Sequence, residues 1–164
     1  MVTTTSTVAE HLREAIETAK PRLLSIIESR ASEKPYTDKW SIKEILGHLV
    51  DSASTNHQRI VRMQAAPDIG AFGYEQMHWV NSQHYQSERW DDLVNAWYFY
   101  NKHLAHIIEH INPASLTNVC DMDYGKPMTL QFVAEDYVRH LQHHLNQIFS
   151  GTDPRERTKW MAGA

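Results

Sequence analysis

The stretch that most constrains the fold of this chain is Tyr137-Val138-Arg139-His140-Leu141-Gln142-His143-His144. His140 and His144 are four residues apart, so on a helix they share one face, and two imidazoles placed in this way can bind one metal ion. The same face carries apolar side chains at helical spacing, which indicates the inward side of an amphipathic helix: Val133, Tyr137, Leu141 and Ile148. Two imidazoles are therefore predicted to face the protein interior. A third metal ligand from another helix would explain why these polar rings lie on an apolar face.

The sequence around Ser41 predicts a second long helix, with the clearest start signal in the chain. Ser41-Ile42-Lys43-Glu44 has the form of a capping box, and Trp40 and Ile45 stand at the two positions of a hydrophobic staple. This helix is expected to continue to about Ala66. His48 lies on its apolar stripe, which makes His48 the candidate for the third ligand.

Apolar residues recur at helical spacing in four long segments, each of which begins at a hydroxyl side chain suited to capping. Pro21 is expected to kink the first segment, and Gly151 is expected to end the last one. Between the second and third segments, residues 74–86 are expected to form a short helix or an irregular lid. The long helices are expected over residues 7–31, 41–66, 87–111 and 129–150, with caps at Thr7, Ser41, Ser87 and Thr129.

The 164 residues are enough for one domain with a substantial core. Four amphipathic helices, no convincing strand and one longer connection predict an all-α four-helix bundle over residues 1–151, followed by a polar tail over residues 152–164. In such a bundle, facing helices can bring His48 opposite His140 and His144.

Composition excludes several classes of protein. The formal net charge of -4 gives no indication of nucleic-acid binding, and no apolar run approaches the roughly 18 residues of a membrane span. The single cysteine, Cys120, cannot form an intrachain disulfide and fits a reducing, cytoplasmic location. Asp121 and Asp123 are expected to raise its thiol pKa, which argues against a catalytic nucleophile.

Three neutral imidazoles and one open position match a catalytic zinc-type site, and nickel or another divalent ion would also fit. A chain with eleven histidines also forms such pairs by chance. One example is the flank of the third predicted helix, where three histidines are expected to be a solvated flank or interface rather than a second metal site: His103, His106 and His110.

Three residues near the candidate ligands each have two possible roles. Asp51 could orient a ligand histidine through a hydrogen bond or could serve helix packing. Tyr137 could hydrogen-bond a bound molecule, although a core position is the simpler interpretation. His143 is turned roughly 100° from His144 on the helix, so it is expected on the flank of the site.

Residues Trp40-Ser41-Ile42-Lys43-Glu44-Ile45-Leu46-Gly47-His48-Leu49-Val50-Asp51-Ser52, followed about ninety residues later by the stretch from His140 to His144, resemble the DinB-like superfamily. The similarity is closest to its branch of metal-dependent hydrolases and bacillithiol transferases, and it covers nearly the whole chain. The resemblance implies a four-helix bundle with an up-down-down-up-like arrangement and a three-histidine metal site. By that resemblance the ligand role passes to His48, His140 and His144.

The expected function is a metal-dependent thiol S-transferase or hydrolase that acts on a small electrophile. The family also contains members of unknown activity and members without the metal, so a non-catalytic metal-binding or stress-response bundle is the alternative. A fourth protein ligand would favour that alternative, whereas an open position beside a pocket would favour an enzyme. The pocket walls are expected from residues 67–86 and 113–127, and no residue beyond the metal ligands is assigned a catalytic role.

The third predicted helix carries more large side chains than one inward stripe requires: Trp97, Tyr98, Phe99 and Tyr100. An excess of this kind often marks an interface. We therefore expect a homodimer, with a small-molecule substrate and no nucleic-acid or membrane partner.

Overall fold

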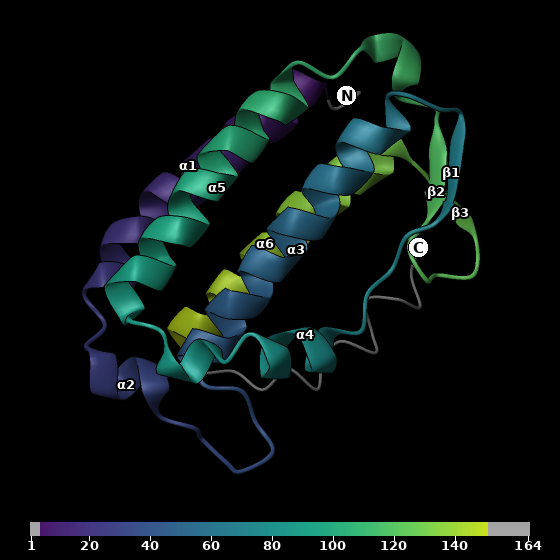
Figure 1. The fold of residues 1–164 in the computed structure, drawn as a ribbon. Helices are drawn as coiled ribbons and strands as arrows, with labels where there is room; N and C mark the ends of the chain where they lie inside the picture. The colour runs from purple at the N-terminus through teal and green to yellow at the C-terminus, as the bar shows by residue number, and fades with distance from the viewer. Residues whose placement is uncertain (1–3, 151–164) are drawn as a thin grey trace.

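The computed structural model describes residues 4–150, and four long helices form its bundle (Figure 1). They are α1 (Thr5–Leu24), α3 (Ile42–Met63), α5 (Trp90–Glu109) and α6 (Leu130–Ser150). Shorter elements are α2 (Glu28–Ser32), α4 (Gln76–Ser82), η1 (Tyr85–Ser87) and η2 (Pro113–Ser115). The predicted four-helix bundle is confirmed. Gly151 and the predicted tail lie outside the described residues.

The predicted caps at Ser41 and Thr129 are confirmed by their hydrogen bonds. The Ser41 hydroxyl accepts from the backbone N–H of Glu44 at 3.2 Å, and the Glu44 carboxylate accepts from the backbone N–H of Ser41 at 2.8 Å. The Thr129 hydroxyl accepts from the backbone N–H of Phe132 at 3.2 Å. These two caps set the phase of α3 and α6, because they satisfy N–H groups that have no partner within the helix.

The first helix differs from the prediction at both ends. Its cap is Thr4, whose hydroxyl accepts from the backbone N–H of Thr7, so Thr7 is not the cap. The helix continues through Pro21 to Leu24, because proline removes only one donor in the last turns. The chain then turns at Ile27, which has an extended backbone, before α2 begins. The predicted kinked helix is therefore two helices.

The third long helix begins three residues later than predicted. Ser87 belongs to η1, and Arg89 at the N-cap of α5 has no capping side-chain hydrogen bond. Instead, the carboxylate of Glu28 in α2 accepts from the backbone N–H of Trp90 at 2.9 Å. A side chain distant in sequence thus replaces the local cap that the pattern around Ser87 had predicted.

The bundle has an up-down-down-up order. α1 and α5 pack side by side, as do α3 and α6, and α3 also packs against α5. The ends of α3 and α5 lie together, since the backbone N–H of Asn112 donates to Gln64 Oε1 at 3.0 Å. These neighbours therefore run parallel, which requires a connection that returns along the full length of the bundle. Residues 64–89 form this connection and include α4 (Figure 1).

A small sheet at one end of α3 and α6 was not predicted. Its strands are β1 (Asp68–Ala71), β2 (Val119–Asp121) and β3 (Pro127–Thr129), in the order β1-β2-β3. β1 pairs parallel with β2, and β2 pairs antiparallel with β3, so that Cys120 lies opposite Met128. The sheet joins the two long connections of the bundle beside the start of α6 (Figure 1).

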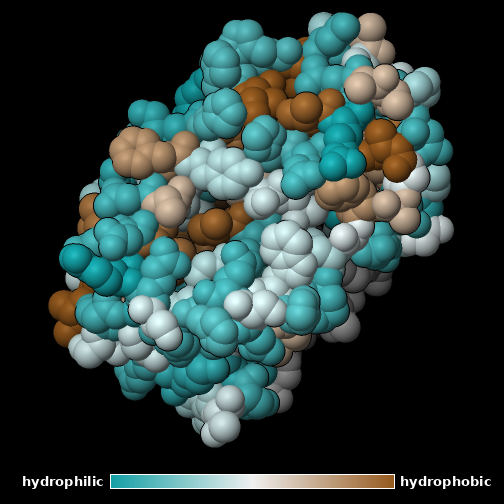
Figure 2. Space-filling view, in the orientation of Figure 1, coloured by the Kyte–Doolittle hydropathy of each residue, from teal (hydrophilic) through white to brown (hydrophobic). Residues whose placement is uncertain are grey.

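Trp97 and Tyr98 contribute to the protein's own core, with 0% and 7% of their surfaces exposed. Phe99 is 60% exposed, and it is the main large apolar side chain that α5 presents to solvent among the described residues. The face shown in Figure 2 is mostly hydrophilic, with its hydrophobic residues in separate groups. Two of the four large side chains that suggested a dimer interface therefore pack in the core of a single chain. The homodimer stays a prediction. Within the described residues, no helix is long and apolar enough to cross a membrane.

Candidate metal centre

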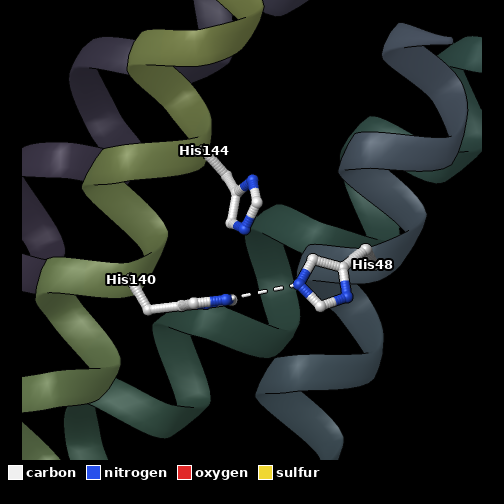
Figure 3. Close-up of side chains that lie close together, drawn as sticks. All are labelled: His48, His140 and His144. Atoms are coloured by element: carbon white, nitrogen blue, oxygen red, sulfur yellow. Dashed lines mark hydrogen bonds between the residues drawn. The ribbon is translucent and has the colours of Figure 1, made fainter. Parts of the chain in front are cut away.

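The structure brings His48 of α3 together with His140 and His144 of α6. Figure 3 shows the three rings pointing toward one another between the two helices. Their ring centroids are 5.1 Å apart for His48 and His140, 4.9 Å for His48 and His144, and 4.6 Å for His140 and His144. One nitrogen of each ring lies within 4.8 Å of a nitrogen of the other two. All three predicted ligands therefore converge on one point.

Hydrogen bonds on the far side of two rings orient them toward that point. Nδ1 of His144 lies 2.8 Å from Oε1 of the buried Gln147, and Nδ1 of His140 lies 3.4 Å from the hydroxyl of Ser52. An amide oxygen only accepts, so Nδ1 of His144 carries the proton and its Nε2 lone pair is available. Such partners are common for metal-binding histidines because they fix the tautomer and the ring plane.

The spacing of the nitrogens fits a divalent metal ion. Nε2 of His48 and Nε2 of His140 are 3.3 Å apart. Two nitrogens that each lie about 2.0–2.1 Å from a tetrahedral zinc ion are separated by about 3.3 Å. His48 and His144 are 0% and 1% exposed, whereas His140 is partly accessible. The three-histidine cluster is thus buried at His48 and His144 and accessible at His140.

His48 has two aromatic neighbours, Trp40 and Tyr74. The centroid of Trp40 lies 5.2 Å from that of His48, and the centroid of Tyr74 lies 6.4 Å from it in a stacked arrangement. The Tyr74 hydroxyl also lies 3.5 Å from Nδ1 of His48. Tyr74 itself stands against Trp79 of α4, so the connection between α3 and α5 covers the metal centre.

A cavity of about 700 Å³ adjoins the centre at His140. Helices α3 and α6 each contribute part of the cavity wall. The remaining walls come from the two connections that the sequence predicts as pocket walls, represented by Tyr74 and Gln76 in one and by Met122 and Tyr124 in the other. The cavity has the volume of a site for a small molecule.

Asp51 does not contact the histidines. Its Oδ1 accepts from the Gln83 side chain at 2.5 Å and from the Tyr85 hydroxyl at 2.6 Å. Tyr85 packs directly on Gly47, where a Cβ would lie 2.2 Å from its ring. Burial raises the pKa of Asp51, while these two hydrogen bonds oppose the rise. Asp51 therefore fastens the connection after α4 to α3, which is the packing role rather than the ligand-orienting one.

Three further residues were considered from the sequence: Tyr137, His143 and Cys120. Tyr137 is buried and its hydroxyl donates to Asn101 Oδ1, which is the core role, and its side chain also forms part of the cavity lining. His143 is half-buried on the flank and lines the cavity, with its ring centroid 5.2 Å from that of His144. Cys120 is fully buried, and burial raises the pKa of its thiol, with Asp121 adding to the rise.

The histidines of α5 form an exposed cluster away from the candidate metal centre. His103, His106 and His110 are all exposed, as expected for a solvated flank. His106, Glu109 and His110 have ligand-type atoms within 4.8 Å of one another. Glu109, however, forms an ion pair with Arg13 at 2.5 Å. This carboxylate is thus already neutralised by a cation.

Three residues that contact the candidate ligands were not predicted from the sequence: Ser52, Gln147 and Tyr74. Ser52 follows His48 by four residues, and Gln147 follows His144 by three, so both share a helix face with a ligand. Helical spacing could therefore have indicated them. Tyr74 lies in a connection without periodicity, and only the tertiary structure shows its contact with His48.

Comparisons with known proteins agree with this fold. A family model described as the DinB superfamily matches residues 8–148. Among solved structures, YfiT from Bacillus subtilis is similar in fold, with a TM-score of 0.78 and 15% sequence identity over 89% of this chain and 84% of that chain. YfiT is described as a probable metal-dependent hydrolase with an unusual four-helix bundle topology. No curated protein sequence matches the chain.

Proposed function

The chain belongs to the DinB superfamily, and on that premise we propose that it is a metal-dependent enzyme acting on a small electrophilic substrate. The proposed reaction is the transfer of a low-molecular-weight thiol or a hydrolysis. His48, His140 and His144 would hold a divalent ion, with zinc or nickel as the candidates. The description of YfiT as a probable metal-dependent hydrolase supports the same class.

The observation that carries the proposal is the convergence of three imidazoles beside a cavity that His140 lines. The cluster holds these three residues and no further His, Cys, Asp or Glu within residues 4–150. Three protein ligands leave a coordination position for an exchangeable molecule, whereas structural zinc sites are usually closed by four protein ligands. The cavity of about 700 Å³ provides room for that molecule at the accessible side of His140.

Each part of the site has a defined task in this proposal. A bound divalent ion would supply Lewis-acid chemistry and would lower the pKa of a thiol or water molecule in the open position. Gln147 and Ser52 keep the imidazoles of His144 and His140 oriented. Trp40 and Tyr74 shield His48 from water, which strengthens electrostatic interactions at the centre.

Metal analysis of the purified protein tests the site. We expect about one divalent ion per chain in the wild type, and none in a variant with His48, His140 and His144 all replaced by alanine. The matched control replaces His103, His106 and His110 by alanine, which removes the same number of imidazoles from an exposed surface. Equal metal content in the two triple variants would contradict the proposed centre.

Activity is tested with a panel of low-molecular-weight thiols and small electrophiles. Loss of free thiol and formation of the thioether would report transfer, and product formed without thiol would report hydrolysis. We expect turnover in the wild type and in the α5 control variant, but not in the variant that lacks the three ligands. A full complement of metal without turnover across both reaction types would favour the non-catalytic alternative.

A further inference from the structure

We propose that Arg59 forms an anion-binding subsite in the cavity beside the three histidines, and that the small molecule used by this protein carries a carboxylate or similar anionic group. This inference rests on the proposed function only for the kind of reaction that the small molecule undergoes. The subsite itself rests on the burial, hydrogen bonds and position of Arg59.

Arg59 is a buried cation that lines the cavity. Its surface is 7% exposed, and burial lowers the pKa of its guanidinium. It forms no ion pair with a carboxylate among residues 4–150. The exposed Asp123 acts on its pKa in the opposite direction, but from beyond ion-pair distance. Because a buried charge is costly to leave unpaired, a position for an anion inside the cavity would compensate this cost.

The hydrogen bonds of Arg59 leave donors for such an anion. Nε and Nη2 donate to the backbone oxygen of Phe72 at 2.9 and 2.5 Å, and Nη1 donates to Asn56 Oδ1 at 3.3 Å. All these acceptors are neutral. Each terminal nitrogen of a guanidinium carries a second N–H, so both Nη1 and Nη2 keep one donor beyond these contacts. Two donors on one planar group match the geometry of a carboxylate.

Arg59 also stands at a useful distance from the metal centre. His48, Ser52, Asn56 and Arg59 follow one another along α3, and the last three line the same cavity as His140. Asn56, which fixes the guanidinium, is eight residues from His48 and therefore roughly 12 Å away along the helix axis. A small molecule that reaches the candidate metal centre at His140 can thus place an anionic group against Arg59 at its other end.

Other charged groups at the cavity are less suited to this role. Arg139 is paired with Asp136 at 2.9 Å, so its charge is already compensated. Lys126 is exposed and therefore hydrated. Arg59 differs from both because its charge is buried and its hydrogen-bond acceptors are neutral.

The test measures binding of hexanoate to the full-length protein, with the uncharged hexanamide as the matched ligand. Isothermal titration calorimetry measures the affinity in every variant, and the side-chain Nε–H signal of Arg59 in nitrogen-15 NMR locates the binding in the proteins that keep this residue. We expect a saturable shift with hexanoate and none with hexanamide. We expect affinity to fall by about tenfold or more in Arg59→Gln, since the charge-assisted hydrogen bonds to the carboxylate are lost.

Two variants keep the result interpretable. Asn56→Asp leaves Arg59 and its bond to Phe72 in place but puts a carboxylate beside Nη1, so it should weaken hexanoate binding even if Arg59→Gln fails to fold. Arg62→Gln is the control for charge, because Arg62 is exposed on the same helix and lies outside the cavity lining. Equal affinity for hexanoate in Asn56→Asp and the wild type, or equal binding of hexanamide, would overturn the proposal.

A second arm identifies which reactant carries the anionic group. The metal content of the protein is measured first, so failure of the metal site and failure of the Arg59 subsite are seen separately. Affinities for 6-mercaptohexanoate and 6-mercaptohexanol are then compared in the wild type and in Asn56→Asp. A preference for the carboxylate thiol that Asn56→Asp removes assigns the anion to the thiol. Equal affinities for the two thiols, together with hexanoate binding at Arg59, assign it to the electrophile.

Discussion

Gln147 accepts a hydrogen bond from His144 at 2.8 Å, one turn further along the same helix. The bond fixes the ring of a metal-ligand candidate from the side away from the centre. Gln147 is not one of the three candidate ligands. Its effect on metal binding can therefore be measured while all three histidines remain in place.

The first prediction is that Gln147→Leu weakens metal affinity by about 10–100-fold, the usual effect of removing a hydrogen bond behind a metal-binding histidine. The helix should remain folded, because leucine is a good helix former of similar size. Competition with a chromophoric chelator measures the affinity. Gln142→Leu, at an exposed position of α6, is the control and should leave it unchanged. Equal affinities for both variants would show that Gln147 does not support the centre.

The second prediction concerns the close contact of Gly47 with Tyr85. A Cβ at residue 47 would lie 2.2 Å from the Tyr85 ring, so Gly47→Ala must displace that ring. We expect a loss of about 1–3 kcal/mol in the free energy of unfolding, as for other overpacked cores. In a Tyr85→Ala background the same change should cost much less. Urea denaturation of the four proteins in this double-mutant cycle measures the coupling, and additive effects would exclude the steric explanation.

The third prediction is a pH dependence at Glu28. Two hydrogen bonds lower the pKa of Glu28 in the folded protein. The larger effect comes from Lys43 and the smaller one from the backbone N–H of Trp90. A lowered carboxyl pKa contributes stability above the unfolded value, and this contribution is lost as the pH falls through the folded value. Glu28→Gln should therefore be less stable than the wild type at neutral pH, with a difference that shrinks as the solution is acidified. Denaturation midpoints at a series of pH values measure the difference.

The control for Glu28 is Glu33→Gln. Glu33 pairs with Arg30 on the surface at 2.5 Å, and both side chains are largely exposed. Exposed pairs contribute little, so this variant should stay close to the wild type at every pH. A Glu28→Gln difference that does not change with pH would show that the charge of Glu28 is not involved.

The fourth prediction is the homodimer. Phe99 is 60% exposed and is the large apolar side chain of α5 available for an interface. Light scattering at micromolar concentration should give about twice the 19.0 kDa of one chain, and Phe99→Asp should reduce the mass to that of one chain. A wild-type mass near 19.0 kDa would contradict the prediction. Val61→Asp, another exposed apolar position, serves as the control.

The sequence by itself determined the helices that carry the metal centre. Capping at Ser41 and Thr129 is local, because each cap satisfies N–H groups within its own first turn. Once the phase of α3 and α6 is set, helical spacing turns His48, His140 and His144 to the inward face. For this reason the bundle and the convergence of these three histidines could be predicted without coordinates.

Only the tertiary structure decided the elements whose backbone groups find distant partners. The start of α5 depends on Glu28, which lies 62 residues earlier, so the local signal at Ser87 was misleading. Each strand of the sheet has only three or four residues and pairs with a segment far away or across a turn, which leaves no periodic signal. The same holds for Arg59, whose burial and unpaired charge arise because the connection carrying Phe72 folds back over α3.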